Sequence, residues 1–97
     1  MATHELKTWP GPFEATWVGS KTFELRKADR PFAVGDTLVL REYDPETSEY
    51  SGRLVEALVT YVLDAVPFFG LEDDHCIMSI RRVRAGWDVT GAKHDAR

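Results

Sequence analysis

The amino-acid sequence predicts a mainly β fold of the α+β class, a small β-barrel with one early helix covering its mouth. Several short segments alternate apolar and polar residues with the period of a strand, and turn residues separate them. One short segment near the start carries helix signals instead. A chain of 97 residues can build only one compact core. Because many short strands have to hide their edges, a barrel is the favoured arrangement.

The first two elements are a strand over residues 3–7 and a helix over residues 10–18. Pro10 or Pro12 can occupy the first helical turn, where the missing N–H is tolerated, and Gly19 follows as a stop signal. The helix is therefore short and returns the chain quickly to the sheet.

Phe13 and Trp17 stand four residues apart in this helix, so they lie on one face of it. A packing role against the sheet is the interpretation we favour for both rings. Trp17 has an alternative role, because an exposed indole is also suited to stacking on a nucleic-acid base.

Four more strands are expected, over residues 21–27, 37–43, 53–64 and 75–83. A polar connection with Pro45 and Gly52 separates the second and third of these. Residues 38–43 and 53–63 should therefore pair as a long antiparallel hairpin.

The domain is predicted to span residues 1–84. From Ala85 onward the sequence loses its period and most of its apolar content. Residues 85–97 are therefore expected to form a mobile C-terminal tail. Trp87 is the large apolar residue in this tail.

The charge distribution favours a local anion site over a surface that grips a long nucleic acid. The net charge is −4, whereas nonspecific binding to a phosphate backbone needs many Lys and Arg. Residues 1–30 carry a net charge of +1, residues 31–80 carry −8 and residues 81–97 carry +3. An anionic ligand is therefore expected at a site built from the two ends of the chain; an unevenly charged solvated surface is the alternative.

Composition also sets expectations about metals, cofactors and location. The single cysteine, Cys76, excludes an internal disulfide and lies in an apolar run, and the three histidines are scattered. We therefore expect no metal and no cofactor. The start of the sequence shows no leader and no segment is long and apolar enough to span a membrane, so a cytoplasmic protein without a membrane partner is predicted.

The segment Gly19–Asp36, GSKTFELRKADRPFAVGD, gathers charges around two apolar residues. The period of a strand places Phe23 and Leu25 on one face and Thr22, Glu24 and Arg26 on the other, with Lys21 just before them. Lys and Arg can hold a phosphate, and the Glu carboxylate can accept a hydrogen bond from the exocyclic amine of cytosine or adenine. The alternative is a set of ion pairs on a solvated strand face, which contributes about 0 to 1 kcal/mol.

Several stretches together resemble the ASCH-like domains of the PUA-like superfamily, which includes small bacterial and phage members. They are HELKTWP, the pattern F-x5-G-S-K-T-F-E-L-R from Phe13, F-x-V-G-D from Phe32, LREYDPET and IMSI. The resemblance implies a small β-barrel with a polar cleft between barrel and helix, in a superfamily whose members bind RNA or modified bases.

The same resemblance implies a set of ligand-binding residues. Lys21, Thr22, Glu24 and Arg26 match the motif that lines the ASCH cleft. His4 and Lys7 belong to a stretch that resembles a smaller subfamily, and Trp17 is the base-stacking candidate.

Three function classes follow, and the first is favoured: a module that binds RNA or a modified nucleoside or nucleotide. The first alternative is an amidohydrolase that acts on N4-acylated cytidine, for which Lys21, Thr22 and Glu24 are the catalytic candidates. In such enzymes the threonine lies two residues beyond the K-T pair, where this chain has Glu24. The second alternative is a protein–protein interaction module that uses a sheet edge or the cluster Arg81, Arg82 and Arg84.

Overall fold

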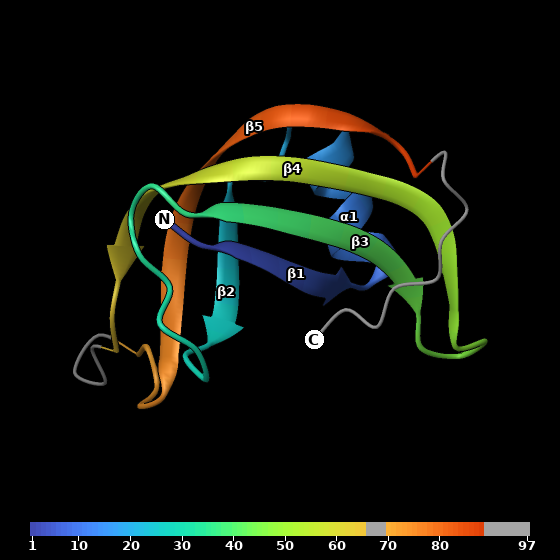
Figure 1. Ribbon diagram of the computed structural model, residues 1–97. Helices are drawn as coiled ribbons and strands as arrows, with labels where there is room; N and C mark the ends of the chain where they lie inside the picture. The colour runs from blue at the N-terminus through green and yellow to red at the C-terminus, as the bar shows by residue number, and fades with distance from the viewer. Residues whose placement is uncertain (66–69, 89–97) are drawn as a thin grey trace.

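The computed structural model describes residues 1–65 and 70–88, which form one curled sheet and one helix (Figure 1). The mainly β fold of the α+β class is confirmed. In chain order the elements are β1 Thr3–Thr8, α1 Pro10–Trp17, β2 Phe23–Lys27, β3 Thr37–Asp44, β4 Glu49–Leu63 and β5 His75–Trp87. Each element coincides with one that the sequence pattern predicts, with ends that differ by up to four residues.

The sheet has the strand order β1-β3-β4-β5-β2. β1 runs parallel to β3, and the other neighbours are antiparallel, including the predicted β3–β4 hairpin. β1 and β2 are the two edges and do not pair with each other, so the predicted barrel is half closed. Figure 1 shows the strands as an arch, with β2 running downward beneath it along the first part of β5.

Irregularities in the long strands explain why the sheet curls. The register shifts between Arg41 and Tyr43 on β3 and at two places along β4, between Glu56 and Ala57 and between Val59 and Tyr61. A bulge adds a residue to one strand, bends it and increases its twist. The bends bring the two edge strands toward each other.

The core fills the concave side of the sheet, beneath α1. Phe13 is completely buried and joins a cluster of apolar side chains from β1, β3, β4 and β5, namely Leu6, Leu38, Leu40, Val55, Ala57, Val59, Cys76, Met78 and Ile80. Trp17 is partly buried and packs on the edge of this cluster. Gly19 then takes a φ of 90°, a left-handed conformation that glycine adopts without strain, and the chain turns toward β2.

The predicted domain end at residue 84 is too early. β5 continues to Trp87 and pairs Ala85, Gly86 and Trp87 with Val55, Leu54 and Arg53 of β4. The indole of Trp87 lies edge-on to that of Trp17, with 6.4 Å between ring centroids. These residues lack an apolar period of their own, and the strand persists because β4 provides a ladder for it. The remainder of the predicted tail, residues 89–97, lies outside the described residues.

Candidate functional site

The charged face of β2 points into the molecule and its apolar face points out. Glu24 is only 2% exposed, whereas Phe23 and Leu25 are 47% and 54% exposed. The two-residue period was predicted correctly. The ion pairs of the alternative interpretation do form, but Glu24 lies on a buried face and not on a solvated one. Glu24 pairs in register with Met78, a core residue of β5, and this register turns the carboxylate inward.

Two cations hold the buried carboxylate. The Lys21 ammonium donates to Oε2 of Glu24 at 2.6 Å, and Nε of Arg26 donates to Oε1 at 2.9 Å. Both cationic side chains keep part of their surface in water, with 17% of the Lys21 side chain and 23% of the Arg26 side chain exposed. The carboxylate therefore lies behind two charged donors that remain accessible.

Thr8 completes what we call the Glu24 cluster: Thr8, Lys21, Glu24 and Arg26. Its buried hydroxyl accepts a hydrogen bond from Nη2 of Arg26 at 3.1 Å. Thr8 is the last residue of β1, so this contact joins the two edge strands that no backbone ladder connects. Sequence reasoning missed Thr8 because nothing in its neighbourhood shows that β1 and β2 face each other.

Three residues predicted to bind ligand lie apart from the Glu24 cluster. Thr22 is exposed and precedes β2; its carbonyl accepts from Ile80 N–H. Lys7 lies on the outer face of β1, with its ammonium 4.5 Å from the Tyr43 ring centroid. The Trp17 ring contacts Phe13 and Trp87 and stacks under the Arg53 guanidinium, which lies 4.8 Å from the ring centroid.

His4 is also separate, because it forms a buried pair with Asp36 at the start of β3. Its Nε2 lies 2.8 Å from Oδ2 of Asp36, and the ring packs edge-on against Phe32. Asp36 also accepts hydrogen bonds from the backbone N–H groups of Ala2 and Ala33, at 2.9 and 3.0 Å. This arrangement ties the N-terminus to the loop before β3, so His4 has a structural role here.

The Asp36 carboxylate predicts a loss of stability in acid. The hydrogen bond from Ala2 N–H, followed by that from His4, lowers the pKa of Asp36 below its ordinary value of 3.8. Because the folded pKa lies below the unfolded one, the stabilisation is complete above about pH 4 and is lost as the pH falls through the folded pKa. Urea unfolding at about pH 6 and about pH 3 should therefore show a smaller difference for Asp36→Asn than for the wild type.

An exposed carboxylate provides the control for this measurement. Glu46 lies exposed in the β3–β4 connection, and Glu46→Gln should leave the acid-induced difference as in the wild type. An unchanged difference in Asp36→Asn would show that other carboxylates dominate acid unfolding.

A second buried ion pair lies at the other end of the sheet. Arg53 donates to both oxygens of Glu42, at 2.9 and 3.0 Å, and to Glu14 of α1 at 2.9 Å. The bond from Arg53, supported by one from Ser51, lowers the pKa of Glu42. The Arg53 guanidinium also lies over the rings of Phe13 and Trp17. This pair fastens α1 to β3 and β4.

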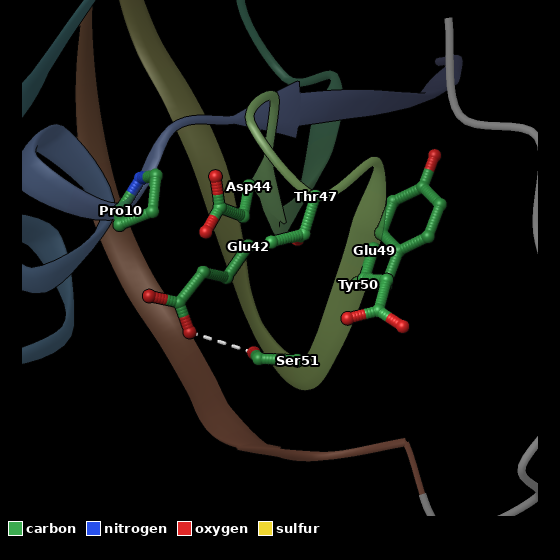
Figure 2. A pocket seen from close by; sticks show the side chains of 7 residues that line it. All are labelled: Pro10, Glu42, Asp44, Thr47, Glu49, Tyr50 and Ser51. Carbon is green, nitrogen blue, oxygen red and sulfur yellow. Dashed lines mark hydrogen bonds between the residues drawn. The ribbon is translucent and has the colours of Figure 1, made fainter.

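A pocket of about 310 Å³ opens beside this pair, away from the predicted site (Figure 2). It is lined by Pro10, Glu42, Asp44, Thr47, Glu49, Tyr50 and Ser51. Figure 2 shows carboxylates around the pocket and the bond between Glu42 and Ser51. Three carboxylates oppose a phosphate, and within residues 1–65 and 70–88 no group of His, Cys, Asp or Glu is placed to hold a metal ion. The pocket therefore does not suit an anionic ligand.

The outer face of β2, β5 and β4 carries a set of exposed apolar side chains. Phe23 of β2 and Tyr61 of β4 both pair in register with Ser79 of β5. Leu25 and Leu63 both pair with Ile77 in the same way. Tyr61 is 58% exposed and Leu63 is 36% exposed.

No helix in the described parts of the chain has the length and apolar character needed to cross a bilayer.

Comparison with known proteins gives a family and a phage relative. The family described as "Domain of unknown function (DUF3850)" matches residues 3–80. The "Uncharacterized 12.9 kDa protein in GpA 3'region" of Escherichia phage P2 is 41% identical over 61 residues, which make up 63% of this chain and 54% of the phage protein. The aligned part thus spans about half the length of that relative. Because the family match covers well over half of the chain, including β1 to β4 and the first part of β5, the chain belongs to the DUF3850 family.

Proposed function

We propose that the chain binds RNA or a modified nucleotide through the Glu24 cluster. One observation carries the proposal: a nearly fully buried carboxylate is held by two partly exposed cations at the junction of two unpaired strand edges. The proposal is independent of the acidic pocket, whose charge opposes nucleotides.

The inverted face of β2 supports a functional role for these charges. Burying a carboxylate costs several kcal/mol before its partners compensate, and an apolar side chain of similar size is often at least as stable in such a position. β2 offers Phe23 and Leu25 for the core but turns them outward and buries Glu24 instead. Departures from local folding rules of this kind are expected at functional sites.

The chemistry of the cluster complements a nucleobase and its phosphate. The Glu24 carboxylate accepts hydrogen bonds only, so it would fit the exocyclic amine of cytosine or adenine once a ligand draws the partly exposed Lys21 ammonium away from it. Arg26 offers a planar set of donors to base carbonyl or phosphate oxygens, and Lys21 offers a mobile ammonium. The Thr8 hydroxyl can donate as well as accept. Together the four groups provide both the acceptor and the donors that cytosine needs.

The resemblance to ASCH-like domains supports the same proposal, because Lys21, Glu24 and Arg26 of the shared motif converge in space. The fourth motif residue, Thr22, does not join them. A function on cellular RNA or its nucleotides would place the protein in the cytoplasm, which we include in the proposal.

The geometry favours binding over amide hydrolysis. A threonine nucleophile needs a base within hydrogen-bond distance, whereas the exposed Thr22 lies outside the buried face that carries Glu24. Within the described residues, the hydroxyl that belongs to the cluster is that of Thr8, and it accepts a hydrogen bond from Arg26.

Titration with cytidine 5′-monophosphate tests the proposal. Lys21→Ala and Arg26→Ala should each weaken binding by about 10- to 100-fold, because each removes a charged hydrogen-bond donor that contributes roughly 1.5 to 3 kcal/mol. Lys27→Ala is the matched control, since Lys27 lies on the same strand but is exposed and paired with Asp74 at 3.8 Å. Calorimetry measures all four proteins under the same salt.

Two results would contradict the proposal. One is equal binding by the wild type and both cluster variants. The other is steady release of cytidine from N4-acetylcytidine by the wild type, abolished in Lys21→Ala, which would establish the hydrolase instead.

A further inference from the structure

Arg82 lies on β5 just beyond the point where its ladder with β2 stops, at Phe23, the first residue of β2. The β2–β5 ladder runs from Lys27 and His75 to Phe23 and Ser79, and Ile80 N–H then donates to Thr22 O at 3.1 Å. From there β5 continues to Trp87 with β4 on one side. Within the described residues no strand lies along its other side, so this part of β5 is a free edge.

The arginines of the chain differ in how they are neutralised. In the described part of the chain, five have a carboxylate oxygen within 4 Å: Arg26, Arg30, Arg41, Arg53 and Arg84. Among residues 1–65 and 70–88, Arg81 and Arg82 have no such partner. In a chain with a net charge of −4, these two positive charges remain available to an external anion.

The Arg82 guanidinium is held by one hydrogen bond and keeps further N–H donors for a ligand. It donates one hydrogen bond, through Nη1, to the carbonyl of Trp17 at the C-terminal end of α1. A guanidinium has five N–H donors, so four remain. Gly19 lies beside it, since a Cβ at that residue would be 4.0 Å from Nη2 of Arg82. Arg82 is exposed. Its guanidinium is held in place beside the turn that leads from α1 to Lys21.

Arg82 lies on the same face of the sheet as Glu24. Glu24 pairs with Met78, and Arg82 follows four residues later on β5, opposite the buried Ala57. At about 3.3 Å per residue, the separation along the strand is roughly 13 Å. This backbone separation leaves room between Glu24 and Arg82 for more than one nucleotide, so the phosphate of a neighbouring nucleotide can reach Arg82. Arg81 points to the opposite face and is not part of this arrangement.

We propose that the ligand of the Glu24 cluster is a single-stranded nucleic acid longer than one nucleotide, and that Arg82 binds the phosphate of a neighbouring nucleotide. This inference rests on the proposed function. The planar guanidinium bonds two phosphate oxygens at once, which suits a fixed contact at an open strand edge. The strongly acidic middle of the chain restricts the contact to a short stretch of strand.

The experiment compares cytidine 5′-monophosphate with a four-nucleotide oligocytidylate, as RNA and as DNA, at several salt concentrations. The wild type should bind the tetranucleotide about tenfold or more tighter than the mononucleotide. Arg82→Ala should remove this gain, leave the mononucleotide affinity unchanged and reduce the slope of log K against log salt by about 0.7. The RNA and DNA arms identify which sugar the strand carries.

Two control variants separate binding from folding. Arg84→Ala removes an arginine of the same strand that Glu56 already neutralises at 2.5 Å, so it should keep the wild-type slope. Arg82→Lys retains the charge and should keep most of the slope, even if the bond to Trp17 is weakened. Thermal unfolding confirms that each protein is folded.

The outcomes distinguish this inference from the function on which it rests. If the mononucleotide binds and depends on Glu24, but the tetranucleotide gains nothing, the inference is wrong and the proposed function stands. The inference is also wrong if Arg82→Ala weakens both probes equally. If neither probe binds, or if Glu24→Gln leaves both affinities unchanged, the proposed function is wrong and the inference falls with it.

Discussion

Phe13→Ala is expected to lower the free energy of unfolding by about 3 to 5 kcal/mol, the usual cost of truncating a buried phenylalanine. Phe13 is completely buried and lies where α1 meets the sheet, among side chains of four strands. The Arg53 guanidinium lies over this ring, 5.1 Å from the ring centroid. Urea unfolding followed by tryptophan fluorescence measures the loss.

Val18→Ala is the matched control for this prediction. Val18 lies at the end of the same helix but is 59% exposed. Its truncation should change the free energy of unfolding by no more than about 0.5 kcal/mol. Equal effects of the two substitutions would mean that α1 is not packed on the sheet as described.

Glu24→Leu is expected to weaken nucleotide binding strongly while the chain stays folded. The substitution removes the acceptor for the base amine, so affinity for cytidine 5′-monophosphate should fall by about 10- to 100-fold or more. The leucine fits the buried side of β2, and both cations are exposed enough to turn toward water. Calorimetric titration and urea unfolding of the same protein give the two readouts.

A surface substitution on the same strand provides the comparison. Leu25→Ser changes the neighbouring residue, which is 54% exposed on the outer face, and should leave nucleotide affinity unchanged. If Glu24→Leu unfolds the chain and Leu25→Ser weakens binding, the assignment of the two faces of β2 is wrong.

The sequence was sufficient to predict the elements of the fold but not the orientation of β2. Alternation reveals that Glu24 lies opposite Phe23 and Leu25, and apolar residues are ordinarily the ones that face a core. Which side is buried depends on the register with β5, where Glu24 meets Met78 from a segment more than fifty positions later in the chain. Local pattern carries no information about that partner.

The extent of β5 was missed for a related reason. Ala85 and Gly86 have weak strand preference, so the sequence indicates a tail. Their hydrogen-bonding partners are Val55 and Leu54 of β4, and this long strand continues the ladder regardless of local preference. Long-range pairing therefore decided the outcome.

The candidate site was predicted in part. Lys21, Glu24 and Arg26 lie close together in the sequence, so a strand period was enough to group them. Thr8 and His4 depend on contacts between distant segments. Thr8 joins the cluster only because β1 and β2 are the two edges of a curled sheet. His4 instead pairs with Asp36, because the turn before β3 places the Asp36 carboxylate beside the His4 ring.

The most direct test of the central claim is base discrimination by the wild type and Glu24→Gln. Calorimetry should show that the wild type binds cytidine 5′-monophosphate more tightly than uridine 5′-monophosphate. Uracil lacks the exocyclic amine that donates a hydrogen bond to the carboxylate. In Glu24→Gln the amide can also donate, so the preference should shrink or reverse. Equal binding of the two nucleotides by the wild type, or the same preference in both proteins, would contradict the account.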